Sequence, residues 1–427
     1  MPWRRPRTHV DRAREIRRSE EEALEEKAEH AAEDQAVELA AIDGASIVEA
    51  ATGEPEDDHA PSDLAAKLGA AVEGVELPAL SEHRAPPRRV RAAPPSEAAV
   101  PVVAGPEPHP EDGIDLEVEV ARGLRLRNPV LTASGTFGQG VEYAELIDVS
   151  RLGAMVNKGT TLHARPGNPQ YRIAETPSGI LNSIGLENPG AAAVAKRYAR
   201  EWPALGLPVI VNVAGHTVAD YVGVVLEMEG TPGVVAYELN VSCPNVKGGT
   251  LFGCDPALAA EVTRAVKAET DKPVIVKLTP SAPDVVAVAR ACEEAGADGL
   301  TAINTVPGMR IDVARRRPVL GTGSGGLSGP AIRPIAVHIT YQVAQAVAIP
   351  IVGAGGVTCA EDALEFLMAG ASAVQVGSAT FADPLAPIRI VEGLAAYVRA
   401  NGLASIRDIV GAAQRGRKRD AGTEYVE

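Results

Sequence analysis

From residue 129 onward, short apolar runs alternate with longer alanine-rich stretches. Eight of these runs have the length of buried strands, and they cover residues 129–134, 153–158, 208–215, 234–243, 273–280, 299–305, 350–356 and 373–378. The stretches between most of them, such as 256–269, 283–295 and 361–369, favour helices. Because continuous apolar strands are buried on both faces, the pattern predicts an α/β fold with a parallel sheet covered by helices. Eight such repeats close into a (β/α)8 TIM barrel, with an open doubly wound sheet as the alternative.

Two different regions precede these repeats. Residues 116–120 alternate between apolar and polar, and Gly123 separates them from 124–126, which predicts a short β-hairpin at the start of a barrel domain over residues 111–427. Residues 1–110 are rich in Ala, Glu and Pro, and Trp3 is their only aromatic residue. Such a segment buries too little apolar surface to offset its chain entropy, so we expect a loose helix and then disorder. A solvated spacer and a docking segment both fit this composition.

The charge of the 427-residue chain is unevenly distributed. The total is −15, from 41 Lys and Arg against 56 Asp and Glu, and residues 1–110 hold 13 of the former and 23 of the latter. The extension therefore carries −10 and the remainder only −5. A mildly acidic barrel argues against nucleic acid or an anionic membrane as its partner.

Cysteine spacing and apolar run length indicate the cellular compartment. Cys243, Cys254, Cys292 and Cys359 show no C-x-x-C spacing of the kind that binds zinc or an iron–sulfur cluster, so reduced thiols are expected. No apolar run reaches the roughly eighteen residues that a membrane-spanning helix needs. The basic start leads into charged residues instead of an apolar signal sequence. The sequence therefore predicts a soluble, cytoplasmic protein.

The carboxyl ends of the predicted strands are mostly polar or glycine, and in a barrel these ends meet at the mouth that holds the active site. The pair Gly355–Gly356 follows the seventh strand and the pair Gly377–Ser378 follows the eighth, which suits a phosphate group bound by backbone N–H groups. Lys158 and Lys277 also end strands, and a buried ammonium needs a partner, so we expect an anionic or carbonyl-rich ligand. No cluster of His or carboxylate residues occurs there, and no metal site is predicted.

A glycine pattern at residues 321–326 matches G-x-G-x-x-G. A dinucleotide-binding fingerprint follows a strand and has an acidic residue about twenty positions later. Here three arginines and a proline precede the glycines, and the region near Ala346 has no acidic residue. We therefore interpret the segment as a flexible loop between the sixth strand and its helix.

Cys243 stands where the fourth strand ends, in the segment YELNVSCPNVK of residues 237–247. Amide side chains flank it at Asn240 and Asn245, and Lys247 adds positive charge nearby. Most free cysteines are small buried apolar residues, but a strand end with this polar context favours a reactive site.

Four long segments, in order along the chain, match those of one enzyme family. They are NKGTT at 157–161, LNSIGLENPG at 181–190, NVSCPNVK at 240–247 and LSGPA at 327–331. Together they resemble dihydroorotate dehydrogenase of class 1 over about residues 114 to 415, whereas the extension before Ile114 has no counterpart in that family. The resemblance implies a TIM barrel with bound FMN that oxidises dihydroorotate to orotate in pyrimidine (UMP) biosynthesis.

The resemblance also implies roles for individual residues. For substrate binding it implies Lys158, Asn182, Ser183, Ile184, Gly185, Leu186, Asn240, Asn245, Asn304 and Thr305. For FMN binding it implies Ser134, Lys158, Gly159, Asn212, Asn240, Lys277, Ile303, Gly329, Gly355, Gly356, Gly377 and Ser378. Amides suit a planar ring of alternating C=O and N–H groups because each amide both donates and accepts. Cys243 is the implied catalytic base, which removes a proton from C5 while a hydride leaves C6 for flavin N5.

The family contains several types that differ in electron acceptor. The segments CPNVKGG at 243–249 and GGLSGPA at 325–331 are closest to class 1B. That class implies electron transfer to NAD through a partner subunit with FAD and a 2Fe–2S cluster, in a heterotetramer built on a homodimer of this chain. A class 1A enzyme that reduces fumarate is one alternative; the membrane-linked class 2 enzymes place Ser at the base position and are disfavoured. Two further alternatives are a related flavin barrel acting on dihydropyrimidines and a non-catalytic phosphate-binding barrel.

Overall fold

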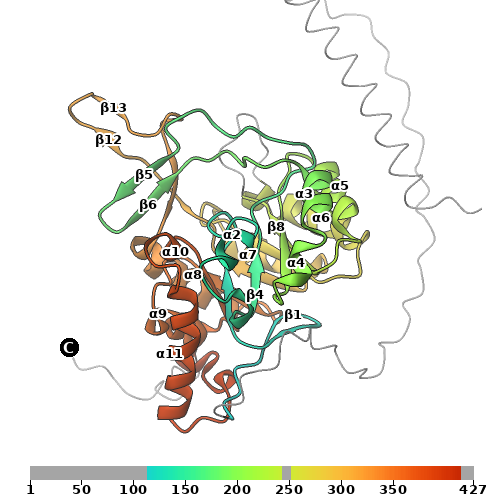
Figure 1. The fold of residues 1–427 in the computed structure, drawn as a ribbon, viewed down its shortest axis with the longest axis vertical. Coiled ribbons are helices and arrows are strands. Elements are labelled where there is room, and N and C mark those ends of the chain that lie inside the picture. The colour runs from blue at the N-terminus through green and yellow to red at the C-terminus, as the bar shows by residue number, and fades with distance from the viewer. Residues whose placement is uncertain (1–112, 243–251, 415–427) are drawn as a thin grey trace, which may run out of the picture. The chain divides into compact units, whose positions relative to one another are not determined.

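Eight parallel strands form a closed barrel in the computed structural model, which describes residues 113–242 and 252–414 (Figure 1). Around the ring the strands are β10 (Gly299–Ala302), β15 (Ile351–Ala354), β16 (Ala373–Val376), β3 (Val130–Thr132), β4 (Ala154–Val156), β7 (Val209–Val213), β8 (Val234–Asn240) and β9 (Val274–Leu278). β9 pairs in turn with β10 and closes the ring. Each strand lies within one of the eight predicted runs. The barrel prediction is confirmed, and the open-sheet alternative is wrong.

The barrel strands are apolar because both of their faces are covered. Every residue of β3, β4, β7, β9, β10, β15 and β16 is buried. Buried polar residues nevertheless interrupt the barrel strands, among them Asn212, Glu238, Lys277, Thr301 and Gln375. Since a buried polar group is costly unless it is hydrogen-bonded, these five side chains require partners inside the barrel.

Helices follow most of the barrel strands. The longer ones are α3 (Ala191–Tyr198), α5 (Val218–Met228), α6 (Pro256–Lys267), α7 (Val285–Glu294), α8 (Arg333–Ala344), α9 (Ala360–Ala369) and α11 (Ala386–Ala400). The short ones are α2 (Val141–Ala144), α4 (Glu201–Ala204) and α10 (Ala379–Ala382). Side-chain caps start several of them: Thr217 caps α5, Asp255 caps α6 and Asp284 caps α7. The helices predicted at 256–269, 283–295 and 361–369 are confirmed.

The predicted N-terminal hairpin is present and closes one end of the barrel. β1 (Val118–Ala121) pairs antiparallel with β2 (Leu124–Leu126), and Gly123 takes a φ of +79° in the turn between them. The Arg122 N–H donates to the carbonyl of Asp298, the residue before β10, at 2.8 Å. The hairpin therefore lies at the amino ends of the strands, and the other end is left for ligands.

A second sheet, which the sequence patterns did not predict, stands at the carboxyl ends of the barrel strands. Its antiparallel strands, in order, are β11 (Val306–Gly308), β14 (Gly325–Ser328), β6 (Gly179–Asn182) and β5 (Ile173–Thr176). β5 and β6 belong to the insertion after β4, and β11 and β14 to the insertion after β10. Two insertions that are distant in sequence thus combine into one sheet beside the barrel mouth.

This sheet corrects the prediction of a flexible loop at 321–326. Gly325 and Gly326 begin β14 and are buried. A Cβ atom on Gly325 would lie 2.3 Å from the Asn182 carbonyl oxygen, and one on Gly326 would lie 2.1 Å from Thr305 Oγ1. Glycine is required here because neighbouring strands approach closely, and not because the segment needs flexibility.

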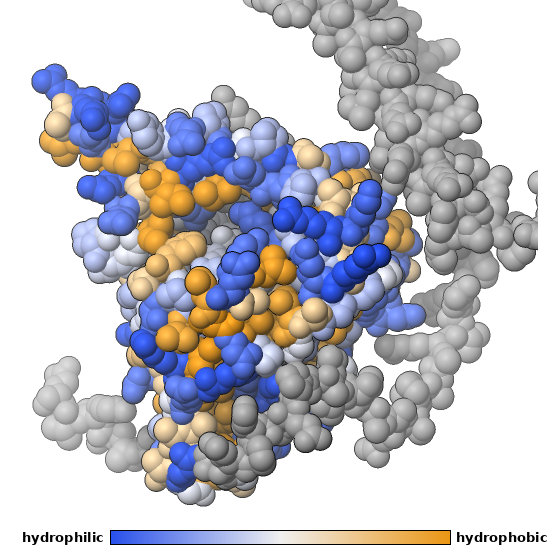
Figure 2. Space-filling view, in the orientation of Figure 1, coloured by the Kyte–Doolittle hydropathy of each residue, from blue (hydrophilic) through white to orange (hydrophobic). Residues whose placement is uncertain are grey.

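A two-stranded hairpin, β12 (Ile311–Asp312) with β13 (Arg317–Pro318), projects from this region at the upper left of Figure 1. Figure 2 shows mostly hydrophilic residues at its end and hydrophobic ones toward its base. Met309 and Val313 are 56% and 83% exposed there. Across the described residues, no helix is both long enough and apolar enough to cross a membrane.

Candidate active site

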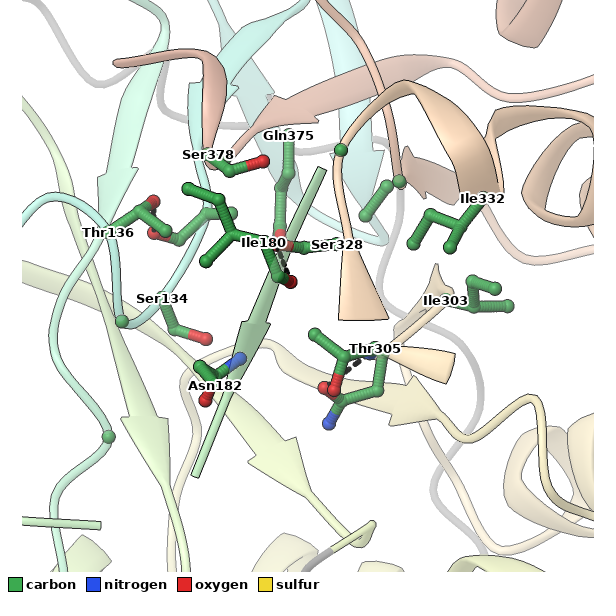
Figure 3. A pocket seen from close by; sticks show the side chains of 18 of the residues that line it. Ser134, Thr136, Ile180, Asn182, Ile303, Thr305, Ser328, Ile332, Gln375 and Ser378 are labelled. Atoms are coloured by element: carbon green, nitrogen blue, oxygen red, sulfur yellow. Dashed lines mark hydrogen bonds between the residues drawn. The ribbon is translucent and has the colours of Figure 1, made fainter. Parts of the chain in front are cut away.

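A cavity opens at the mouth of the barrel, between the strand ends and the second sheet (Figure 3). The carboxyl ends of all eight barrel strands contribute to its wall. The predicted residues that line it are Ser134, Lys158, Gly159, Asn182, Ile184, Gly185, Leu186, Asn212, Asn240, Lys277, Ile303, Asn304, Thr305, Gly329, Gly355, Gly356, Gly377 and Ser378. The structure therefore gathers in one cavity residues that are up to 244 positions apart in the sequence.

Three predicted site residues are not part of this wall as described. Ser183 is 1% exposed and does not line the cavity. Its Oγ lies 2.7 Å from Thr322 Oγ1 and accepts a hydrogen bond from Asn168 Nδ2 at 3.0 Å, so it ties the segment after β6 to neighbouring loops. Cys243 and Asn245 lie outside the described residues, as does the extension 1–110.

One side of the cavity is built from glycines at the ends of β15 and β16. Gly355 and Gly356 have φ values of +131° and +77°, a region that favours glycine. A Cβ on Gly356 would lie 2.8 Å from both Arg333 Cβ and the Gly329 carbonyl oxygen. Within the described part of the chain, the N–H groups of Gly355, Gly356, Gly377 and Ser378 donate to no other group. Unused N–H groups on a glycine loop are suited to an anion such as phosphate.

Further parts of the cavity wall present amide side chains. Asn304 Nδ2 donates to Asn240 Oδ1 at 3.0 Å, and Asn304 Oδ1 accepts from the Thr305 N–H at 2.8 Å. Asn182, on β6 of the second sheet, donates through Nδ2 to the Gly326 carbonyl at 3.2 Å. These bonds fix the orientation of the amides while leaving the Asn240 Nδ2 donor and the Asn182 Oδ1 acceptor for a ligand.

The two strand-end lysines have different surroundings. Lys277 Nζ donates to Gln375 Oε1 at 2.8 Å and lies 3.5 Å from Glu238 Oε1, so it has the protein partners that the sequence had not revealed. For Lys158, burial lowers the pKa of the ammonium, Glu187 partly opposes this and Arg172 adds to it. An anionic or carbonyl-rich ligand at Lys158 would favour the charged form.

Comparison with known proteins identifies the family to which this site belongs. A family model described as dihydroorotate dehydrogenase matches residues 115–398. The chain belongs to the dihydroorotate dehydrogenase family. Within it, the chain falls in class 1B: it is 50% identical over 299 residues to "Dihydroorotate dehydrogenase B (NAD(+)), catalytic subunit" of Geotalea uraniireducens, a match over 70% of this chain and 98% of the relative.

Two further relatives carry the same name. The protein of Desulforamulus reducens is 51% identical over 301 residues, with 70% of this chain and 99% of the relative covered. That of Anoxybacillus flavithermus is 54% identical over 293 residues, with 68% and 93% covered. The similarity thus spans nearly the whole length of these relatives and the barrel of this chain.

Dihydroorotate dehydrogenases depend in general on FMN, and the cavity residues fit that group. Asn212 Oδ1 is buried in the wall without a hydrogen-bond partner among the described residues, so it needs a donor from a ligand. The nearest described atom to a Cβ built on Gly377 would be Ala133 Cβ at 3.5 Å, which leaves room beside the glycine N–H. Apolar side chains of Ile180, Ile303 and Ile332 form further wall for a flat ring (Figure 3).

Sequence reasoning missed several residues of the dihydroorotate dehydrogenase cavity. Figure 3 shows Thr136, Ile180, Ser328, Ile332 and Gln375 in its wall. Ile180 and Ser328 belong to the unpredicted sheet, so their place in the wall depends on a strand pairing that no local pattern indicates. Gln375 was detectable, because a polar residue inside a four-residue buried strand needs a partner. Among the described residues, no three His, Cys, Asp or Glu side chains gather as a metal site would require.

Proposed function

We propose that this chain oxidises dihydroorotate to orotate with bound FMN, as the catalytic subunit of an NAD-linked enzyme of pyrimidine biosynthesis. The observation that carries the proposal is the cavity itself, with glycines suited to an anion at the ends of β15 and β16 and amides at the ends of β7, β8 and β10 around the same mouth. A ligand with a phosphate at one end and a polar ring at the other matches both groups. The names of the relatives supply the reaction.

The chain would hold FMN at both ends. Gly329, Gly355, Gly356, Gly377 and Ser378 would bind the phosphate through backbone N–H groups. The remaining predicted cofactor residues, Ser134, Lys158, Gly159, Asn212, Asn240, Lys277 and Ile303, would surround the ring and its side chain. When bound, the flavin supplies the hydride acceptor for the reaction.

The substrate ring would be positioned by amides that are already fixed in orientation. Asn182 and Asn240 each have one end tied to the protein, so the Asn182 Oδ1 acceptor and the Asn240 Nδ2 donor face the ligand in defined directions, while Asn304 holds Asn240 in place. Lys158 would face the negative or carbonyl groups of dihydroorotate. Preorganised groups of this kind reduce the entropy lost when reacting atoms are brought together.

We further propose Cys243 as the base that removes the C5 proton. The residue lies outside the described part of the chain, but Asn240 and Ser242, three positions and one position before it, both line the cavity. A thiol with an ordinary pKa near 8.5 is closer to working pH than a serine hydroxyl, so it acts as a base with less assistance.

The visible spectrum tests the proposed function. We expect the purified chain to be yellow and to lose its flavin absorbance when dihydroorotate is added without oxygen. A colourless protein would favour a non-catalytic barrel. A flavin that is bleached by reduced uracil but not by dihydroorotate would instead indicate a dihydropyrimidine enzyme.

The phosphate assignment predicts a selective loss of FMN affinity in Gly377→Ala. A new Cβ would make only ordinary contact with Ala133 at 3.5 Å, so the fold should tolerate it. The methyl group would nevertheless occupy space beside the phosphate, and losing one charge-assisted hydrogen bond costs about 1.5–3 kcal/mol, or roughly a tenfold to hundredfold rise in Kd. The measurement is quenching of flavin fluorescence on titration of the apoprotein.

Two controls make this test specific. Gly230→Ala has no atom within 4 Å of the new Cβ and lies away from the cavity, so FMN affinity should not change. Riboflavin lacks the phosphate, so its weaker binding should be the same in Gly377→Ala as in the parent chain. Equal losses for FMN and riboflavin would contradict a phosphate site at Gly377.

A further inference from the structure

Glu238 is a carboxylate enclosed by the barrel, with no solvent exposure. It receives hydrogen bonds from Asn212 Nδ2 at 2.8 Å, Thr301 Oγ1 at 2.7 Å and Gln375 Nε2 at 2.5 Å. Lys277 Nζ lies 3.5 Å away as its counter-charge. Donors from four other strands, β7, β9, β10 and β16, therefore converge on one side chain of β8.

We propose that Glu238 is a positioning residue that sets which cavity groups donate and which accept hydrogen bonds toward the flavin. The inference rests on the proposed function. It concerns a residue that lies beneath the cavity wall and acts through Asn212, Gln375 and Lys277, which are in that wall.

The orientation of Asn212 follows from the chemistry of its partner. A carboxylate only accepts hydrogen bonds, so Asn212 must turn its NH₂ group toward Glu238. Its Oδ1 then faces away from Glu238, toward Gly159, where a Cβ would lie 3.0 Å from that oxygen. This Oδ1 is the buried acceptor that lacks a partner among the described residues. Glu238 thereby makes position 212 an acceptor at the cavity.

The same reasoning determines how the Gln375 amide is oriented and which Lys277 donor remains for a ligand. Gln375 donates through Nε2 to Glu238, so its Oε1 is left to accept from Lys277 Nζ at 2.8 Å. The Lys277 ammonium has three N–H groups, and Gln375 and Glu238 occupy two directions. The third donor remains for the cavity. The wall thus presents an acceptor at Asn212 and a donor at Lys277.

The strand order indicates which part of the flavin meets these groups. In the closed ring, β7 lies four strands from β15 and is therefore opposite the glycine loop. A flavin anchored there by its phosphate would present its ring system to Asn212. The imide N3–H is the only N–H group of the oxidised flavin ring, so it is the donor that matches Asn212 Oδ1. Carbonyl oxygens of the same ring match the Lys277 donor.

Glu238→Gln tests the inference with little change in side-chain shape. The new NH₂ group cannot accept from every donor around it, so Asn212 or Gln375 must turn, and the fixed polarity is lost. We expect the parent chain to bind FMN at least about tenfold more tightly than N3-methyl-FMN. The reason is that FMN can donate its N3–H to the buried Asn212 Oδ1, whereas the methylated analogue leaves this acceptor without a partner. Glu238→Gln should largely remove this preference. Because a negative charge is lost near the ring, the reduction potential of bound flavin should also rise.

Glu229→Gln is the matched control. Glu229 also accepts hydrogen bonds from two hydroxyl groups, of Tyr237 and Thr270, and pairs with Lys272 at 2.6 Å, but it does not line the cavity. We expect this variant to lose thermal stability while keeping the preference for FMN and the flavin potential. If Glu238→Gln behaves in the same way, Glu238 has only a structural role and the inference is wrong.

Thr301→Val provides a second variant should Glu238→Gln fail to fold. Thr301 is not in the cavity wall, and its removal leaves the carboxylate charged but with one donor fewer. We expect the flavin potential to fall, and an unchanged potential would overturn the inference. These measurements need no substrate, so a chain that prefers FMN over N3-methyl-FMN but is not reduced by dihydroorotate would refute only the proposed function.

Discussion

Replacing Cys243 with Ala is expected to slow the reduction of bound flavin by dihydroorotate by about 10²–10⁴-fold, the range for loss of a positioned base. The flavin should stay bound, since the residues proposed to hold it end other strands or precede Cys243 on β8. Reduction needs the C5 proton to leave as the hydride departs from C6. Without the thiol, only water or a distant group would accept that proton.

Stopped-flow mixing of each oxidised protein with dihydroorotate under anaerobic conditions measures this rate. The other cysteines provide controls, because none of them lines the cavity. Cys292 is fully enclosed on α7, and burial raises the pKa of its thiol to about 12. Burial also raises the thiol pKa values of Cys254 and Cys359. Ala at any of these three positions should leave the rate within a few-fold of the parent chain.

A pH profile separates a base from a packing residue. The parent rate should rise as the pH approaches the thiol pKa, near 8.5 if unperturbed, because the thiolate is the reactive form. Cys243→Ala should lose that rise. A variant that reduces its flavin at the original rate would show that Cys243 only packs beside the site.

The barrel could be predicted from the sequence because its signal is local. A strand such as β15, with all four residues buried, is encoded by an unbroken apolar run, and a helix such as α6 has a cap and a proline at its start. The pairs Gly355–Gly356 after β15 and Gly377–Ser378 after β16 mark strand ends in the same local way. Once eight strands are recognised, the closed fold brings their ends together, and this explains why so many of the predicted residues line one cavity.

The second sheet and the buried polar network could not be predicted because they depend on long-range pairing. β6 pairs with β14, and the Asn182–Gly326 bond spans 144 positions. Gly325 resembled a loop residue because glycine serves flexible turns and close strand contacts equally well. Glu238 gave a partial signal, since an acidic residue in an apolar strand needs a partner, but nothing local shows which lysine or amide provides it.

The second large effect is expected in electron transfer to NAD. We predict that this chain alone, loaded with FMN, oxidises dihydroorotate with artificial acceptors but does not reduce NAD. The G-x-G-x-x-G segment at 321–326 is partly β14 of the second sheet, so it does not provide the strand-to-helix turn of a dinucleotide site. Hydride transfer to NAD requires a bound nicotinamide, and we expect a partner to supply that site.

Steady-state turnover of dihydroorotate with an artificial acceptor, NAD or fumarate, each supplied in turn, measures which acceptor this chain reduces. Adding a flavoprotein subunit that carries FAD and a 2Fe–2S cluster should give NAD reduction from an undetectable background, in a complex that contains two copies of each chain.

A chain that begins at Asp112 should behave the same way if residues 1–110 are a spacer. If, with the partner present, the shortened chain does not support NAD reduction but the full chain does, and flavin reduction is intact in both, the extension serves to dock the partner. Rapid fumarate reduction by the single chain would contradict the NAD-linked assignment, while the barrel, the FMN site and the role of Cys243 would remain as proposed.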